Sequence, residues 1–184
     1  MFRRILVATH GTAGARLAEE YGVKLARALD AELHALYVIH KGWGSIAGIE
    51  WLHASHVRME FYHYAEAQFR RRAQEVLDAF IARAHALSTM TYVTVGEPGE
   101  SMAETATAIQ ADLLIIGPTA RVRSEEYQAR VSLKKLLKHA PCPVLIANHP
   151  SQIITTGKEV MLQPNSQIMK DTDNPEALSL SHVE

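Results

Sequence analysis

Apolar and polar positions repeat along most of this chain with two different periods, which predicts strands alternating with helices. Five short apolar runs have the length and composition of strands: residues 5–8, 31–39, 90–95, 112–117 and 143–147. Four segments between them carry apolar side chains three and four residues apart, the period of an amphipathic helix: residues 13–29, 57–87, 101–110 and 130–139. The predicted element order is therefore βαβαβαβαβ.

This order predicts an α/β fold built on a single open parallel sheet. Parallel neighbours require a crossover of a dozen or more residues, and each predicted helix provides one. Because such crossovers are almost always right-handed, we expect helices on both faces of a doubly wound, five-stranded sheet.

The apolar stripes of the helices predict which side chains face the sheet. These side chains are Leu17, Ala18, Tyr21, Leu25 and Leu29 in the first helix, and Phe61, Tyr64, Ala65, Phe69, Ala73, Val76, Leu77, Phe80, Ile81 and Ala84 in the long second helix. Ser101 and Glu104 have the spacing of a capping box, which predicts that the third helix begins at Ser101.

The character of the chain changes after residue 149. Residues 1–149 contain all of the predicted elements and are expected to form one domain. Beyond them, Gly157, Pro164 and Pro175 interrupt a weak periodicity. We interpret residues 150–184 as an extension that is partly mobile or packs on a partner.

Composition narrows the class of protein. The 184 residues are 47% hydrophobic and 21% charged, which is typical of a globular domain with a real core. A formal net charge of -1 does not favour binding to nucleic acid or to an anionic membrane. A single cysteine excludes an internal disulfide, and no run of 18 apolar residues occurs, so we expect no membrane insertion and a cytoplasmic location.

Four short motifs, in this order and spacing, resemble the universal stress protein family (UspA-type domain). They are ILVATHGT at residues 5–12, VGEP at 95–98, ADLLIIG at 111–117 and HAPCPVL at 139–145. The resemblance covers roughly residues 2–148.

The resemblance implies an adenine nucleotide alpha hydrolase-like (Rossmann-like) sheet of order 3-2-1-4-5, with a ligand crevice outside the carboxyl ends of the first and fourth strands. In nucleotide-binding members, adenosine lies against the ends of strands one, two and four, and the phosphates lie on a loop of pattern G-x2-G-x9-G-[ST]. The candidate nucleotide site in this chain therefore consists of Ala8, Thr9, His10, Val38, Ile116, Gly117, Thr119, Ala120, Arg130 and Val131. No cofactor is expected to be required, and ATP or AMP is the expected ligand if one binds.

This chain departs from the phosphate-binding pattern at three of its four positions. Gly117 occupies the first glycine position, but Ala120 and Arg130 replace the second and third glycines, and Val131 replaces the hydroxyl residue. His10 stands where nucleotide-binding members usually carry an acid. A glycine cradle brings backbone N–H groups close to phosphate oxygens, so these replacements predict weakened or lost nucleotide binding.

Two features near the crevice have alternative interpretations. Arg121, Arg123 and Arg130 form either a solvated charged loop or an altered anion site, since guanidinium groups bind phosphate without a glycine cradle. Thr12 is expected to cap the first helix, whereas His10 either belongs to the turn or lines the crevice and titrates near neutral pH.

Histidines and tryptophans offer two further candidates. His53, His56 and His63 share a face if the long helix begins early enough, which would allow zinc or nickel binding, although a polar outer face explains the same spacing. Trp43 and Trp51 lie in a long loop and either cover the sheet edge or contact a ligand or partner.

The sequence contains no Ser/His/Asp arrangement, paired catalytic carboxylates or HExxH motif that would indicate a hydrolase. The leading hypothesis is a non-enzymatic universal stress protein acting through dimerisation and binding to an unknown protein partner. The resemblance implies a homodimer paired through Val144, Leu145 and Ile146 of the fifth strand. The alternatives are an ATP- or AMP-gated switch with at most slow hydrolysis, and a metal-responsive protein.

Overall fold

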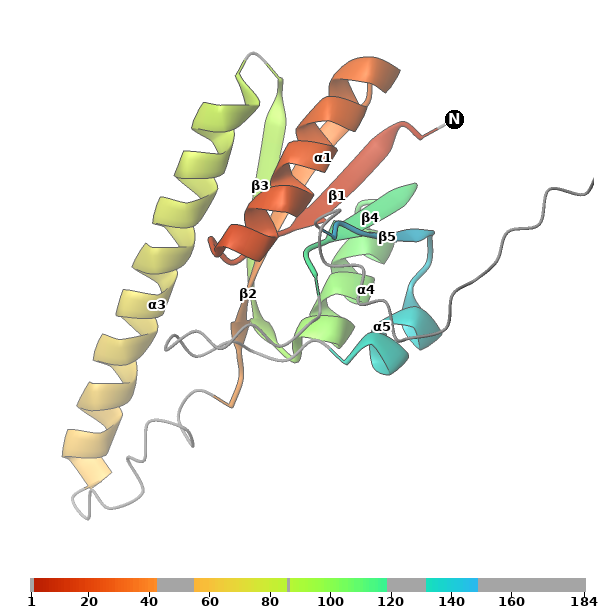
Figure 1. Cartoon of the computed structure of the whole chain (residues 1–184). Helices are drawn as coiled ribbons and strands as arrows, with labels where there is room; N and C mark the ends of the chain where they lie inside the picture. The colour runs from red at the N-terminus through yellow and green to blue at the C-terminus, as the bar shows by residue number, and fades with distance from the viewer. Residues whose placement is uncertain (1, 43–54, 86, 119–131, 149–184) are drawn as a thin grey trace, which may run out of the picture. The chain divides into compact units, whose positions relative to one another are not determined.

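The computed structural model describes residues 2–42, 55–85, 87–118 and 132–148. In chain order these residues form β1 (Arg4–Ala8), α1 (Ala13–Leu29), β2 (Glu32–His40), α3 (Ser55–Ala84), β3 (Thr89–Gly96), α4 (Pro98–Ala108), β4 (Leu113–Ile116), α5 (Leu133–His139) and β5 (Val144–Ile146). Figure 1 shows these strands and helices in the colours of their positions along the chain. The predicted alternation of strands and helices is confirmed.

The five strands form one parallel sheet of order β3-β2-β1-β4-β5, as the resemblance implied. β1 is central: Val7 pairs with Ala35 of β2 on one side and with Ile115 of β4 on the other. From β1 the chain leads to β2 and β3 on one side and then returns to β4 on the other side of β1. β1 and β4 therefore flank the switch point, where open α/β sheets bind ligands.

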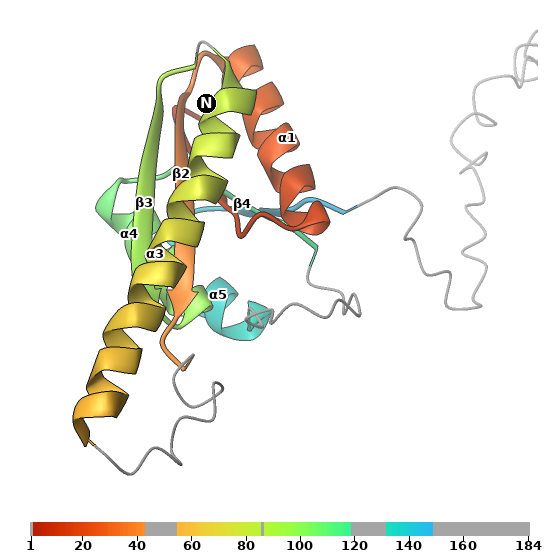
Figure 2. The ribbon, with the colours of Figure 1, turned by 90° about the vertical axis from the view of Figure 1, so that its left-hand side faces the viewer.

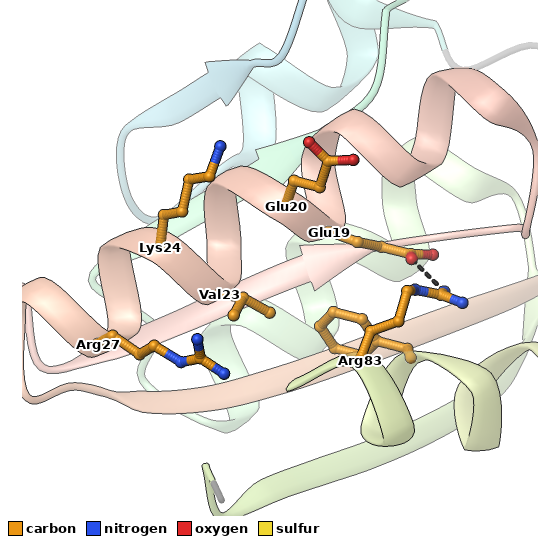
Figure 3. A pocket seen from close by; sticks show the side chains of 7 residues that line it. Glu19, Glu20, Val23, Lys24, Arg27 and Arg83 are labelled. Atoms are coloured by element: carbon orange, nitrogen blue, oxygen red, sulfur yellow. Dashed lines mark hydrogen bonds and ion pairs between the residues drawn. The ribbon is translucent and has the colours of Figure 1, made fainter. Parts of the chain in front are cut away.

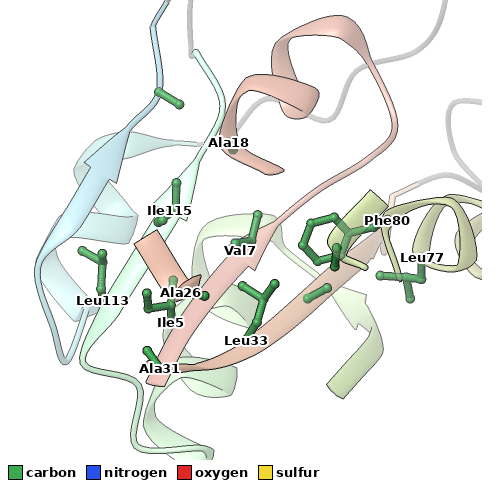
Figure 4. Packing of buried hydrophobic residues seen from close by; sticks show 13 residues of the cluster. Ile5, Val7, Ala18, Ala26, Ala31, Leu33, Leu77, Phe80, Leu113 and Ile115 are labelled. Atoms are coloured by element: carbon green, nitrogen blue, oxygen red, sulfur yellow. The ribbon is translucent and has the colours of Figure 1, made fainter. Parts of the chain in front are cut away.

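One face of the sheet carries α1 and α3, which share a hydrophobic cluster with Val7, Leu33 and Ile115 (Figure 4). α1 packs very closely on β1. A Cβ added at Gly22 would lie only 2.3 Å from Val7 Cγ2, so this contact requires glycine. The residues of α1 that face this contact are small or acidic: Ala15, Ala18, Glu19, Gly22 and Ala26 are the buried ones. The prediction that Tyr21 is buried is wrong, since 42% of it is exposed, because this narrow stripe of small residues brings the helix axis close to the strand.

α3 has two unlike halves. Its C-terminal half buries Ala73, Val76, Leu77, Phe80 and Ala84 against the sheet, as predicted. Its N-terminal half extends beyond the carboxyl ends of the strands, which both ribbon views show (Figures 1 and 2). Three side chains of this half that were predicted to face the sheet are instead exposed, namely Phe61, Tyr64 and Phe69; Ile81, in the C-terminal half, is also exposed because it lies beside the buried stripe. The helical period alone did not reveal where the sheet beneath the helix ends.

The opposite face carries α4 and α5, with Leu6, Leu36, Met102, Leu114 and Leu136 in its cluster. The partly buried Cys142 packs against this cluster, as expected for a small core residue, and burial raises the pKa of its thiol.

The predicted start of α4 at Ser101 is wrong. The helix begins at Pro98 with Glu97 as N-cap, and Ser101 lies one turn inside it. Proline is favoured at the first helical position because its φ is already helical and its missing N–H has no partner there. Ser101 is instead buried beside Gly96, where an added Cβ would lie 2.2 Å from the Ser101 Oγ.

Polar side chains meet at the amino ends of the strands. Arg4 Nε lies 3.4 Å from Glu32 Oε2, and Arg4 Nη1 donates to Gln110 Oε1 at 2.9 Å. His34 is buried, its ring stacks on Tyr92, and its Nδ1 lies 3.2 Å from the Tyr92 hydroxyl. Burial lowers the pKa of His34 more than the Glu32 carboxylate raises it.

The last predicted helix is shorter than expected in the described part of the chain. α5 begins at Leu133, with Ser132 as N-cap, and residues 119–131 lie outside the described residues. Residues 149–184 also lie outside them, so the division at residue 149 stays a prediction. None of the helices that the structure describes is long and apolar enough to cross a membrane.

Candidate functional site

The candidate nucleotide site lies at the carboxyl ends of β1, β2 and β4, and six of its ten predicted residues are described. Thr119, Ala120, Arg130 and Val131 lie outside the described residues. Ala8 and Ile116 are buried in the cluster beneath α4 and α5, and Val38 packs against the same cluster. These three side chains therefore form the apolar floor at the strand ends.

Gly117 has a packing role in this structure. An added Cβ at Gly117 would lie 2.8 Å from the carbonyl oxygen of Gly14 and 3.2 Å from the Ala15 Cα. Backbone atoms have little freedom to move aside, so the end of β4 and the first turn of α1 can approach this closely only through a glycine. Its presence is explained without a bound phosphate.

A buried carboxylate joins three elements behind the end of β1. Glu19 of α1 is 2% exposed, accepts a hydrogen bond from the Thr9 hydroxyl at 2.5 Å, and forms an ion pair with Arg83 of α3. A charge this deeply buried is stable only when it is paired and hydrogen-bonded. Glu19 therefore fixes the position of the turn after β1 relative to both helices.

The turn itself carries His10, Gly11 and Thr12. Gly11 has φ +79°, and a Cβ there would lie 2.7 Å from Val76 Cγ2, so both conformation and packing require glycine. Thr12 is the N-cap of α1, as predicted, and its Oγ1 accepts from the Ala15 N–H at 3.4 Å.

His10 is exposed at the rim of this turn. Its Nε2 lies 3.2 Å from Thr12 Oγ1. Desolvation lowers the pKa of the imidazole more than the Glu19 carboxylate raises it. His10 is therefore mainly neutral at pH 7, and it contributes neither the negative charge of an acid nor a full positive charge to the crevice.

A second polar pair lies where β2 and β3 end. His40 Nδ1 accepts the Gly42 N–H at 3.0 Å, so the ring proton of the neutral form is on Nε2, which lies 3.3 Å from Glu97 Oε2. This pair links β2 to the start of α4 at the same end of the sheet as the crevice.

The start of α5 is closed by its own side chain. Ser132 Oγ accepts the Lys135 N–H at 3.5 Å and so occupies one of the free donors at this helix terminus. The adjoining segment, which carries the altered phosphate motif, lies outside the described residues.

The predicted metal site is only partly described. His56 and His63 lie on α3 and are exposed, while His53 lies outside the described residues, as do Trp43 and Trp51. Within the described ranges no group of three His, Cys, Asp or Glu side chains is arranged to hold a metal ion. Binding of zinc or nickel at these histidines stays a prediction.

A hollow of about 210 Å³ lies between α1 and α3, and the Glu19–Arg83 ion pair forms one wall of it (Figure 3). Glu20 and Lys24 line it from α1, so charges of both signs surround it. Sites for small organic ligands typically enclose about 300–1,000 Å³. This hollow is smaller than that range.

Glu19 and Arg83 were not among the site residues predicted from the sequence motifs. Their separation of 64 residues follows no local motif, and only the packing of α1 against α3 brings them together. One signal was present: Glu19 lies between Ala15, Ala18 and Gly22 on the stripe of small residues, where a buried acid requires a partner.

Comparisons with known proteins agree with this architecture. A sequence model of the Universal stress protein family matches residues 1–148. A universal stress protein of Methanocaldococcus jannaschii is 24% identical over 154 residues, which are 83% of this chain and 85% of the relative.

Two solved structures share the fold. The universal stress protein family structure from Arabidopsis thaliana with AMP bound is 17% identical, with a TM-score of 0.55, and the match covers 81% of this chain and 94% of the other. A universal stress protein in complex with cAMP is 20% identical, with a TM-score of 0.51, over 79% of this chain and 95% of the other.

Proposed function

Because a model of the family matches residues 1–148, the chain belongs to the universal stress protein family, and we propose that it is a non-enzymatic regulatory member in which nucleotide binding is weakened or lost. It acts by binding a partner protein in the cytoplasm, without nucleic acid or membrane insertion. It requires no cofactor.

One observation carries this proposal: both hydroxyl groups at the end of β1 are engaged by the protein itself. Thr9 donates to the buried Glu19 carboxylate, and Thr12 accepts the Ala15 N–H and lies beside His10. A ligand that used either hydroxyl would have to replace a bond that already holds the turn in place. Such a replacement gains little free energy.

The altered loop supports the same proposal. Ala120, Arg130 and Val131 replace three residues of the phosphate pattern. Gly117, the one motif residue retained, has an internal packing role against Gly14.

Restoring the motif tests the proposal. We expect no thermal shift of the wild-type protein with millimolar AMP, ATP or cAMP and magnesium. In the variant carrying His10→Asp, Ala120→Gly, Arg130→Gly and Val131→Ser, the nucleotide should raise the free energy of unfolding. The expected increase is about 3 kcal/mol when the nucleotide is at about 100 times its dissociation constant. A control with Arg130→Ala and Val131→Ala removes the same bulk without supplying glycine or hydroxyl. Stabilisation of the wild type by any of these nucleotides would contradict the proposal.

A nucleotide-gated switch is the second candidate function, and the AMP and cAMP bound to two similar structures favour it. It predicts saturable binding of AMP or ATP to the wild type by calorimetry. Phosphate release from ATP would then measure any slow hydrolysis. Binding without release would retain a switch and exclude an ATPase.

We also propose that the protein is a homodimer. The resemblance places the pairing at Val144, Leu145 and Ile146, which are the three residues of the edge strand β5. The opposite edge of the sheet is β3, and the two edges differ greatly in length.

A further inference from the structure

Met90 lies at the amino end of the sheet, beside the buried His34 of the neighbouring strand. Met90 of β3 is the register partner of His34 of β2, and Tyr92 follows two residues later on β3. The three side chains therefore lie on the same face of the sheet. The Tyr92 hydroxyl is 3.2 Å from His34 Nδ1 and 3.8 Å from Met90 Sδ. One phenolic O–H thus stands within hydrogen-bond distance of two acceptors.

We propose that Met90 is an oxidation site, and that its sulfoxide favours the charged form of His34 through the Tyr92 hydroxyl. The inference goes beyond the proposed function, because it concerns neither the nucleotide crevice nor a partner protein. The oxidant is a peroxide: an S–O bond forms at Met90 as the O–O bond of hydrogen peroxide breaks. The thioether is oxidised to the sulfoxide, and the peroxide is reduced to water.

The exposed fractions of the methionines predict which of them react. Met90 is 48% exposed and Met59 of α3 is 58% exposed, whereas Met102 of α4 is only 7% exposed. Oxidation follows accessibility to the oxidant, so Met90 and Met59 should be oxidised before Met102.

In the reduced protein, the Tyr92 hydroxyl determines which nitrogen of His34 carries the proton. A neutral imidazole has one N–H, and a thioether sulfur is only a weak acceptor. The hydroxyl therefore donates to His34 Nδ1, and the ring proton is on Nε2. Nε2 lies 3.6 Å from Glu32 Oε2, too far for a hydrogen bond, and has no other partner among the described residues.

Oxidation of Met90 reverses this arrangement. The sulfoxide is polar, and its oxygen accepts the Tyr92 O–H in place of the sulfur. The phenolic oxygen then only accepts from His34, which requires a proton on Nδ1. A bare Nε2 would direct its lone pair at the Glu32 carboxylate, and a second proton on Nε2 replaces that repulsion by an ion pair.

Two charged groups act on His34 among the described residues. Glu32 on the same strand favours the charged imidazole, and Arg4 of β1 opposes it. Burial opposes the charge more strongly than Glu32 favours it, which lowers the pKa of His34 in the reduced protein. The hydrogen bonds that the sulfoxide creates should raise the pKa of His34 again.

Peroxide treatment of the full-length protein tests the proposal. The His34 titration is followed by NMR, with its signal assigned by its loss in His34→Gln, and the sulfoxide at each methionine is measured by mass spectrometry of peptides. We expect the His34 titration to move to higher pH on oxidation. Methionine sulfoxide reductases should return it to its original position.

Matched variants separate this response from general oxidative damage. Met59→Leu removes a methionine of similar exposure on α3 and should show the same shift as the wild type, whereas Met90→Leu should show none. Tyr92→Phe should still be oxidised at Met90, but its His34 titration should not respond because the hydroxyl is absent. Met90→Gln supplies a permanent amide acceptor and should move the titration to higher pH without peroxide.

Several results would overturn the proposal. One is a Met90 that stays reduced in a sample whose Met59 is oxidised. Another is an unchanged His34 titration after complete oxidation of Met90. A shift that persists in Met90→Leu or in Tyr92→Phe would equally contradict it, since either result would mean that the effect reaches His34 by another route.

Discussion

The two ends of this sheet hold polar groups in different ways. At the carboxyl end, Glu19 is buried as an ion, paired with Arg83 and hydrogen-bonded by Thr9. At the amino end, the ion pair between Arg4 and Glu32 is exposed to solvent, with 40% and 58% of the two side chains accessible.

Among the described residues, a buried polar atom without a hydrogen-bond partner lies toward each end of the sheet, Thr94 Oγ1 of β3 and His34 Nε2 of β2, but only the histidine titrates. His34 is 3% exposed, and its Nε2 has no hydrogen-bond partner, since Glu32 Oε2 lies 3.6 Å away. The carboxyl end is therefore held by charge, whereas the amino end holds a histidine in a place that disfavours its charged form. We expect the first end to determine stability at constant pH and the second to determine how stability changes with pH.

The largest difference is expected from removing one arginine at each end. Arg83→Ala leaves the Glu19 carboxylate buried with only Thr9 as partner, which should lower the free energy of unfolding by about 2–4 kcal/mol. Arg4→Ala breaks an exposed pair and should cost about 1 kcal/mol or less. Urea denaturation measures both.

Arg71→Ala is the matched control, since Arg71 is 72% exposed on the same helix and lies 3.7 Å from Glu75. We expect it to change stability by less than about 0.5 kcal/mol. If Arg83→Ala were as stable as this control, the buried ion pair would stabilise the protein no more than an exposed one, and the expected difference between the two ends would be wrong.

A substitution at Gly11 tests how tightly the carboxyl end of the sheet is packed. Gly11→Ala places a Cβ in a left-handed conformation and 2.7 Å from Val76 Cγ2, and should cost about 2–3 kcal/mol by thermal denaturation. Adding Val76→Ala removes the overlap but also leaves a cavity. The double variant should therefore show a coupling between the two sites, and strict additivity would contradict direct contact.

The pH dependence should come mainly from the amino end. Since burial lowers the pKa of His34, the unfolded chain binds more protons than the folded protein just below pH 6.5. Stability should therefore be fully present above pH 6.5 and fall as the pH decreases, by at most about 1.4 kcal/mol per pH unit for one histidine. Denaturation midpoints measured between pH 7.5 and 5.5 give this slope.

His34→Gln should flatten that profile, because glutamine does not titrate. His10→Asn is the matched change at the carboxyl end, where the pKa of the exposed His10 is also lowered. We expect it to leave most of the slope in place. A profile flattened only by His10→Asn would reverse the assignment.

The smallest expected effect concerns a turn at the amino end. Asp30 ends α1 with φ 52°, a conformation that glycine adopts more readily. Asp30→Gly should stabilise the protein by about 0.5 kcal/mol, and Asp30→Ala should destabilise it by a similar amount. At the carboxyl end the residue with a positive φ is Gly11, which is already a glycine, so the same substitution offers no gain in stability there. Equal stability of the two Asp30 variants would contradict this explanation.

Much of the fold was predictable, because strand and helix periods are local properties of the sequence. The bounds predicted for α1 agree with the structure, and the five strands were each located to within a few residues. The predicted capping box at Ser101 failed because Pro98 starts the helix one turn earlier. The predicted burial of Phe61 and Tyr64 failed because the period of a helix does not show how far its neighbours extend.

The residues of the candidate site also fall into those that the sequence predicted and those that it did not. His10, Thr12 and Gly117 were identified from motifs, whose residues are close in sequence. Glu19 and Arg83 were missed, since their contact depends on the packing of two helices.

The sequence alone determined the element order, the family resemblance and the replacements at Ala120, Arg130 and Val131, because each is a property of neighbouring residues. Only the tertiary structure decided that Gly117 is required by Gly14 and that Glu19 is neutralised from α3. It also decided that one edge of the sheet, β3, is eight residues long and the other, β5, only three. These three features depend on distances between segments far apart in the chain, and such distances are set by packing.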